Sequence, residues 1–247
     1  MTNRYIVEQV FGYFGLVFWS LQLAPQAYKT YRRGTSTGVS VWMMLIWSIA
    51  GVFMGVYNIG LDVSIGLWIQ PQIFTFISCI CVFQELLYQH QLPQWTVYVG
   101  FVITCVLLAA LEVGLVYAYK RAEQVGIQGV LTLFGVLPVI FILAGFLPQY
   151  YEIFRKRRVV GVSHIFLAMD FSGSIFSIIS LVFRDVIDYL DLANYIAIAC
   201  FDVGILLLYY VFEWYQKRLL TNKDVYEDYN DTETAQDDKP SPNSTQP

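Results

Sequence analysis

Seven long apolar runs constrain this chain more than any other feature. A helix needs about 20 mainly apolar residues to cross the hydrocarbon core of a bilayer, and each run reaches that length. The runs cover residues 9–29, 39–59, 65–88, 95–119, 129–154, 163–183 and 192–215. They do not alternate between apolar and polar residues, as the strands of a membrane barrel do. With 57% hydrophobic residues, the sequence predicts an all-α membrane protein with seven transmembrane helices.

The residue types that carry most enzyme chemistry are scarce and scattered. His90 and His164 are isolated from each other, and the four cysteines all fall inside apolar runs, where they act as small buried hydrophobes. The sequence has no Gly-rich phosphate loop, no Cys/His cluster and no paired carboxylates beside a nucleophile. We therefore expect no enzyme activity, no bound metal or cofactor, and no nucleic-acid partner.

The chain contains an internal repeat. A shift of 123 residues places Pro25-Gln26 on Pro148-Gln149, Tyr28 on Tyr151, and Gly38-Val39-Ser40 on Gly161-Val162-Ser163. A duplication is the simplest explanation, so the first three helices correspond to the last three and one connector helix is left between them (3+1+3). Because a single span separates the copies, we expect two parallel three-helix bundles, related by an axis along the membrane normal. Substrate sites in such proteins lie near the midplane where the repeats meet.

The repeat also divides the chain into four parts. We expect a first repeat at 1–92, the connector helix and its loop at 93–128, a second repeat at 129–216, and a disordered acidic tail at 217–247. Basic residues cluster in alternate connections: Lys29, Arg32, Arg33, then Arg155, Lys156, Arg157, Arg158, then Lys217 and Arg218. Since cytoplasmic loops are enriched in Lys and Arg, this pattern predicts a lumenal N-terminus and a cytosolic tail, which is a candidate binding segment for a cytosolic partner.

Asp170 and Asp202 interrupt two apolar runs of the second repeat. A charged Asp at the centre of a membrane helix costs about 2.5 to 3.5 kcal/mol on insertion scales, so the neutral form is favoured. At about 1.5 Å per residue, both carboxylates lie near the midplane. Two separated carboxylates at one depth fit a proton relay, and the alternative is a pair of structural acids hydrogen-bonded to neighbouring helices. Their counterparts in the first repeat, Trp47 and Cys79, do not carry protons.

Pro25 and Pro148 stand inside two of the apolar runs. Proline has no backbone N–H, so the carbonyl four residues earlier loses its partner and the helix kinks. Gln26 and Gln149 supply donors and acceptors beside each break. The recurrence of the pair in both repeats favours a hinge over a static kink. For the substrate site we expect Trp47, Cys79, Tyr28, Tyr151 and Asn194.

Two further polar features receive a structural interpretation. Pro71-Gln72 has no Pro-Gln counterpart in the second repeat and is interpreted as a local kink. Glu112, in the connector helix, is expected near its lumenal end, where it snorkels or pairs with Lys120 or Arg121.

The two Pro-Gln motifs, each followed by a Tyr, a basic turn and a Gly-Val-Ser start to the next helix, resemble the PQ-loop family. This family includes cystinosin, the vacuolar and lysosomal cationic amino-acid transporters and, more distantly, the SWEET sugar transporters. The stretches most similar to the second repeat of cystinosin are residues 147–149, 170–177 and 201–203. The resemblance implies that Asp170 couples protons and that Asp202 serves the proton route. It also implies a 3+1+3 fold, a lumenal N-terminus and export from an acidic lumen.

Residues and resemblance together predict a proton-coupled transporter in the vacuolar or lysosomal membrane. Its partners are then protons, the lipid bilayer and a small amino-acid-like solute, cystine or a cationic amino acid, which it exports to the cytosol. One alternative is an uncoupled SWEET-like sugar facilitator, which the buried acids disfavour because passive sugar transport needs only amides and aromatic side chains. The other is a non-transporting receptor or sensor on the same fold, in which the acidic tail recruits the partner.

Overall fold

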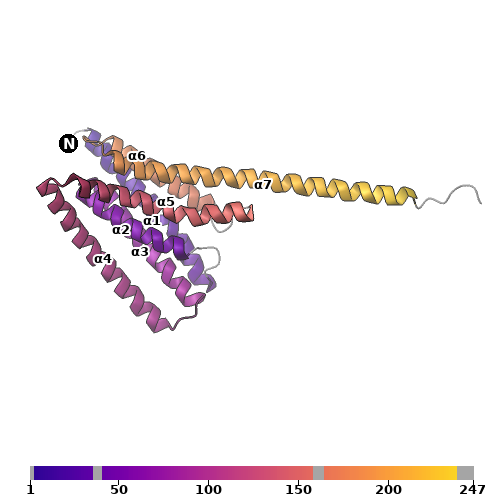
Figure 1. Cartoon of the computed structure of the whole chain (residues 1–247), viewed down its shortest axis with the longest axis horizontal. Coiled ribbons are helices and arrows are strands. Elements are labelled where there is room, and N and C mark those ends of the chain that lie inside the picture. Colours follow the sequence, from indigo (N-terminus) through magenta and orange to yellow (C-terminus); the bar gives the residue numbers. More distant parts are fainter. Residues whose placement is uncertain (1–2, 36–40, 158–163, 238–247) are drawn as a thin grey trace, which may run out of the picture.

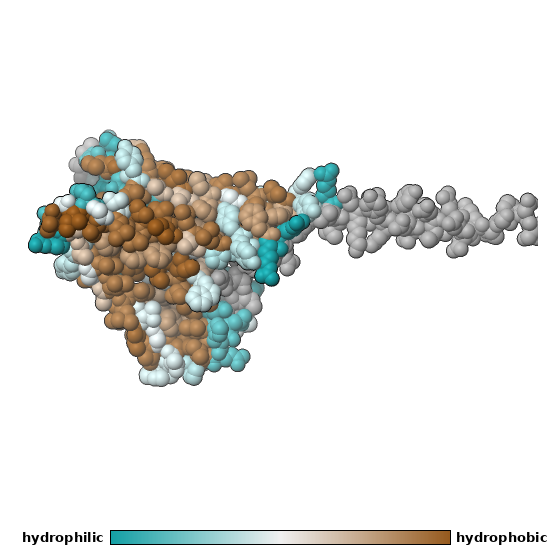
Figure 2. Space-filling view, in the orientation of Figure 1, coloured by the Kyte–Doolittle hydropathy of each residue, from teal (hydrophilic) through white to brown (hydrophobic). Residues whose placement is uncertain are grey.

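The computed structural model describes residues 3–35, 41–157 and 164–237, which form seven α-helices (Figure 1). The helices are α1 (Asn3–Arg33), α2 (Val41–Gly60), α3 (Ile65–Tyr88), α4 (Gln94–Val125), α5 (Gln128–Lys156), α6 (His164–Val182) and α7 (Tyr189–Asp237). All seven are long and apolar enough to cross a membrane, and no strand occurs in these described ranges. A broad hydrophobic band separates hydrophilic ends of the bundle (Figure 2). The prediction of an all-α, seven-span membrane protein is confirmed.

The helices are arranged as two equivalent three-helix bundles. In the first, α3 packs against both α1 and α2, and in the second, α7 packs against both α5 and α6. The bundles meet mainly through two contacts, α1 with α6 and α2 with α5. Exchanging each helix for its counterpart in the other repeat converts one of these contacts into the other. The expected 3+1+3 arrangement of two parallel repeats is therefore confirmed.

The connector helix α4 lies at the periphery of the bundle, apart from the other helices at one edge of Figure 1. It contacts α2, α3 and α5, but its buried side chains are few: Val97, Glu112, Tyr119 and Ala122. A helix that exposes so much apolar surface is suited to lipid and not to water. The connector therefore completes the chain path without entering the centre of the bundle.

The helices continue through the Pro-Gln motifs, as the predicted runs 9–29 and 129–154 do, and the expected kinks stay a prediction. The helix α1 includes Pro25, and α5 includes both Pro138 and Pro148. A proline removes one hydrogen bond of the helix, but the turns on either side keep theirs, and neighbouring helices hold the segment in place. A Pro-Gln pair in these helices is thus compatible with one continuous helix.

Residues 217–237 are helical in the structure, which differs from the expectation of a disordered tail after residue 216. The helix α7 continues to Asp237 and projects beyond the bundle (Figure 1). No Gly or Pro occurs between residues 217 and 239, so an established helix extends there without a new nucleation step. It ends shortly before Pro240, and the last part of the tail, 238–247, lies outside the described residues.

Candidate functional site

A cavity lies at the centre of the bundle, where the two repeats meet. Helices α1, α2, α3, α5, α6 and α7 all contribute to its lining, which includes Trp19, Gln22, Trp47, Phe74, Phe146 and Asp170. The walls are mainly aromatic and aliphatic. In this conformation the cavity leaves about 20 Å³ for the centres of water molecules, which is room for one or two waters. The site is therefore closed to a solute of amino-acid size.

The structure brings the two predicted carboxylates together beside this cavity. Asp170 is 3% exposed on α6, and its carboxylate accepts a hydrogen bond from the side chain of Gln22 on α1. Asp202, on α7, is 2% exposed and lies near enough for the two charges to repel each other. Neither carboxylate oxygen of Asp202 has a hydrogen-bond partner among the described residues. The pair thus combines a partnered and an unpartnered acid inside the membrane-spanning bundle.

Two tryptophans connect the repeats across the cavity. Trp19 Nε1 donates to the backbone carbonyl of Asp170 at 3.4 Å, and Trp47 Nε1 donates to that of Ile142, also at 3.4 Å. The repeat offset relates Trp19 to Ile142 and Trp47 to Asp170. The two hydrogen bonds therefore join symmetry-related positions of the α1–α6 and α2–α5 contacts.

Each tryptophan also lies against a glycine of the opposite repeat. A Cβ atom added at Gly173 would come within 2.1 Å of Trp19 Cδ1, and one added at Gly145 within 2.1 Å of Trp47 Nε1. Each glycine follows the carbonyl acceptor of its tryptophan by three residues, about one helical turn. Small residues at these two positions let the indole rings reach the partner backbone.

The other expected substrate-site residues are dispersed. Trp47 lines the cavity, whereas the side chains of Tyr28 and Tyr151 are 64% and 67% exposed on the outside of the bundle. Cys79 is buried next to the connector helix, and Asn194 donates to the carbonyl of Leu190 within α7. Of the five, the structure therefore brings only Trp47 to Asp170. A helical pattern shows that a residue is on a helix, but not which neighbour its side chain meets.

The Pro-Gln side chains do not line the cavity either. Pro25 is exposed, and Gln26 Nε2 donates to Thr30 Oγ1 of the same helix at 3.4 Å. Pro148 is partly buried, and the side chain of Gln149 lies outside the described part of the structure. The hinge role of both motifs stays a prediction.

Gln22 is a polar residue of the cavity that was not predicted from the sequence, and neither was Trp19. Gln22 is 3% exposed and occurs four residues before Gln26, in an apolar stretch of α1. An amide is costly to bury in a membrane helix unless it finds a partner. The isolated amide in an apolar stretch indicated that Gln22 has a buried polar partner. The sequence could not identify that partner, because Asp170 lies in the other repeat.

Glu112 is buried in the structure, which corrects the expectation that it snorkels or pairs with Lys120 or Arg121. It is 8% exposed on α4 and accepts a short hydrogen bond from Gln72 Nε2 of α3. The side chain occupies a notch at Gly55, where an added Cβ would lie 2.3 Å from Glu112 Oε1. The carboxylate therefore docks the connector helix on the first repeat.

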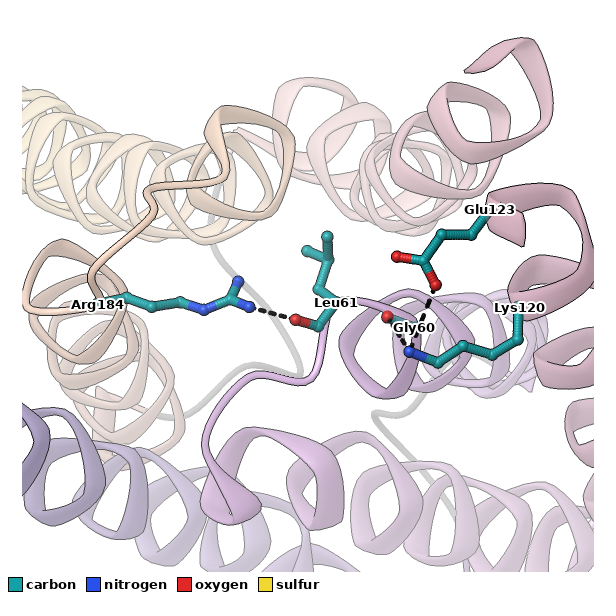
Figure 3. A network of polar contacts seen from close by, with 5 residues as sticks. All are labelled: Gly60, Leu61, Lys120, Glu123 and Arg184. Atoms are coloured by element: carbon teal, nitrogen blue, oxygen red, sulfur yellow. Dashed lines mark hydrogen bonds and ion pairs between the residues drawn. The ribbon is translucent and has the colours of Figure 1, made fainter. Parts of the chain in front are cut away.

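Lys120 instead takes part in a polar network at the end of the bundle where α2 ends (Figure 3). Its Nζ donates to the carbonyl of Gly60 at 2.7 Å and lies 3.7 Å from Glu123. Arg184, from the connection between α6 and α7, donates to the carbonyl of Leu61. The last carbonyls of a helix lack intrahelical partners and attract cations. The end of α2 is thereby tied to both the connector helix and the second repeat.

Comparisons with known proteins agree with this architecture. A family model described as "PQ loop repeat" matches residues 7–67 and 130–189, two ranges that begin at equivalent positions of the repeats. An uncharacterized protein of Schizosaccharomyces pombe, C2E12.03c, is 33% identical over 230 residues, which are 93% of this chain and 80% of that protein. The uncharacterized membrane protein YDR090C of Saccharomyces cerevisiae is 26% identical over 229 residues, 92% of this chain and 72% of its own length.

Proposed function

Because the chain belongs to the PQ-loop repeat family, we propose that it is a proton-coupled transporter of a small amino-acid-like solute. It exports cystine or a cationic amino acid from an acidic vacuolar or lysosomal lumen to the cytosol. One observation carries the proposal: the carboxyl group of Asp170 lies in the central cavity, between the two repeats. A buried ionisable group inside a membrane bundle is a functional-site candidate by default.

Protonation of Asp170 supplies the coupling. With the site open to the acidic lumen, Asp170 takes up a proton and the solute binds in the enlarged cavity. The repeats then rearrange so that the site opens to the cytosol, where the higher pH removes the proton. Each pH unit across the membrane supplies about 1.4 kcal/mol per proton. At one proton per solute, a gradient of about two pH units supports roughly hundredfold accumulation.

The lining of the cavity supports a cationic or zwitterionic solute. Trp19, Trp47, Phe74 and Phe146 present aromatic rings to the cavity, and the protonated Asp170 adds a carbonyl oxygen. Ammonium and guanidinium groups bind favourably to aromatic faces and donate to such an oxygen. This combination favours an amino group of the solute over the hydroxyls of a sugar.

The closed cavity also indicates which contacts change during transport. The indole rings of Trp19 and Trp47 lie against Gly173 and Gly145, across the two junctions between the repeats. A solute of amino-acid size requires these junctions to separate. Rocking of one repeat against the other then opens the two ends of the bundle in turn.

The test is electrical. Cells with the protein at their surface receive cystine, lysine, arginine or glucose at external pH 5 and pH 7. We expect an inward current with one of the amino acids that is larger at pH 5, because the greater proton gradient drives coupled uptake. Asp170→Asn removes the titrating group and should abolish the current, whereas Glu123→Gln, at the exposed end of α4, should leave it intact.

Two results would contradict the proposal. A glucose response of equal size at both pH values would indicate an uncoupled facilitator. A current that keeps its pH dependence in the Asp170→Asn variant would remove Asp170 from the coupling mechanism. Surface labelling of each variant ensures that the currents are compared at equal amounts of protein.

A further inference from the structure

One face of α6 carries polar groups along most of its length. Asp170, Ser174, Ser177 and Ser180 follow each other at spacings of four, three and three residues, which places them on one side of the helix. The three serines are 0% exposed. A row of buried polar groups in a membrane helix is costly unless they bond to one another, to neighbouring helices or to water.

The hydroxyl of Tyr195 connects this row to two other helices. Tyr195 is 0% exposed on α7, and its hydroxyl accepts a hydrogen bond from Asn58 Nδ2 of α2 at 3.4 Å. It also shares a hydrogen bond with Ser177. Ser177 in turn lies 3.4 Å from Gln70 Oε1 of α3. Because a hydroxyl accepts and donates at the same time, this group is able to pass a proton along a chain of hydrogen bonds.

Asp191 lies one turn before Tyr195, near the start of α7, and its side chain is 0% exposed. The groups around it are Asp188 and Arg184 in the preceding connection and Tyr57 on α2. Tyr57 donates to Asp188 Oδ1 at 2.9 Å. Asp191 is therefore a buried carboxylate between the end of the bundle and the hydroxyl of Tyr195.

Several atoms along this path have no hydrogen-bond partner among the described residues. They are both carboxylate oxygens of Asp191, Asn194 Oδ1, Asn58 Oδ1, Gln70 Nε2 and Ser174 Oγ. Buried polar atoms of folded proteins are almost always paired with protein or with ordered water. Ordered water bound at these atoms would complete the chain of hydrogen bonds.

The first repeat lacks most of this row, which argues against a purely structural role. At the counterparts of Ser174, Ser177 and Asp191 the first repeat has Gly51, Met54 and Trp68, whereas Ser180 and Tyr195 correspond to the polar residues Tyr57 and Gln72. The same three-helix bundle thus forms in this chain without polar groups at three of these positions. Their presence in the repeat that also holds Asp170 points to a function shared with that carboxylate.

The depth of each group forms a sequence from the end of the bundle to the cavity. At about 1.5 Å per residue, Asp191 lies about 3 Å from the start of α7 and Tyr195 about 9 Å. Ser177 lies about 8 Å, and Asp170 about 18 Å, from the end of α6 at the same side of the bundle. An open cleft at that side, lined by Glu8, Asp62, Arg184 and Asp185, provides solvent and acidic groups above the path.

We propose that Asp191, Tyr195, Ser177 and Ser174, with bridging waters, conduct protons from the end of the bundle where α1 begins to Asp170. The path rests on the proposed function, in that Asp170 is the acceptor. Beyond it, Asp202 is the charged group that faces Asp170, and Tyr150 of α5 is the titratable group near Asp202. The path therefore supplies Asp170 from one side of the membrane, and Asp202 lies at about the same depth as that acceptor.

The experiment follows the protonation of Asp170 by time-resolved infrared spectroscopy on the full chain in liposomes. Protons released from a caged acid by a light flash protonate Asp170 and produce a carboxylic-acid C=O band. Loss of this band in the Asp170→Asn variant assigns it to Asp170. Tyr195→Phe and Ser177→Ala each interrupt the path, so the band should appear at least tenfold more slowly but with the same final amplitude. Tyr119→Phe and Ser48→Ala are matched controls, because both side chains are buried but neither belongs to the path: Tyr119 packs on the ring of Tyr57, and Ser48 donates to the carbonyl of Leu45.

The outcomes separate this inference from the proposed function. Rates equal to wild type in both path variants, with the band still assigned to Asp170, overturn the path and leave proton coupling intact. A band that persists in Asp170→Asn overturns the coupling role of that residue and with it the path. Equal slowing in the Tyr119→Phe and Ser48→Ala controls would show a general packing effect and would also overturn the path. Thermal unfolding identifies any variant that has lost its fold. If one of the two path variants has done so, the rate in the other path variant tests the path.

Discussion

Trp19 and Gly173 meet so closely that position 173 has no room for a larger residue. A Cβ there would lie 2.1 Å from the indole ring, and the ring is held by its hydrogen bond to the carbonyl of Asp170. Overpacking of this kind costs about 1–3 kcal/mol of unfolding free energy. The better helix propensity of Ala contributes only about 1 kcal/mol in the opposite direction. We expect Gly173→Ala to lower the thermal unfolding temperature in detergent.

Gly114 offers the matched control at the same scale. It lies in α4, and no atom lies within 4 Å of the position that its Cβ would occupy. Gly114→Ala should therefore raise stability by up to about 1 kcal/mol through helix propensity alone. An increase in the unfolding temperature for both variants would contradict the close packing of Trp19 on Gly173.

At the scale of the element, a single polar contact near the middle of α4 docks the connector on the bundle. Glu112 accepts from Gln72 in the notch at Gly55. Glu112→Leu leaves the Gln72 amide without this acceptor, which should cost about 1–3 kcal/mol of unfolding free energy. Glu112→Gln keeps an acceptor oxygen at the same place and should retain most of the stability.

Unfolding in detergent, followed by intrinsic tryptophan fluorescence, measures both Glu112 variants. Glu123→Gln is the control, because Glu123 is exposed at the end of the same helix and surface changes usually stay within about 0.5 kcal/mol. If Glu112→Leu were as stable as wild type, the hydrogen bond to Gln72 would not hold α4 in place.

At the scale of the whole molecule, the proposed transport requires the two repeats to separate at one end. Ser64, at the start of α3, and Ser180, on α6, belong to different repeats, and their Oγ atoms lie 3.4 Å apart. Cysteines at both positions are close enough for a disulfide with small adjustments of the side chains. Oxidation of the Ser64→Cys/Ser180→Cys variant should reduce the proton-driven current at least fivefold, and dithiothreitol should restore it.

The single variants Ser64→Cys and Ser180→Cys are the controls for that experiment. Neither forms the cross-link, so oxidation should leave their currents unchanged. A cross-linked double variant with full current would show that this end of the bundle does not open during transport.

The sequence by itself determined the number of spans, the helical class and the duplication. These properties depend on the length of apolar runs and on the spacing of motifs along the chain, so they can be read directly from the sequence. It also singled out Asp170 and Asp202, because a carboxylate in an apolar run is costly wherever the helix packs. The continuation of α7 to Asp237 was not readable from the sequence, since the last apolar run ends near residue 215 and does not say how far the helix extends beyond it.

Only the tertiary structure decided which side chains meet. It placed Gln22 on Asp170 and Gln72 on Glu112, and it left Tyr28 and Tyr151 on the outside. The rotation of each helix about its axis selects these contacts, and that rotation is set by how the helix packs against its neighbours in the bundle. Residues far apart in the chain become neighbours through the whole bundle, so no single stretch of the sequence contains their pairing.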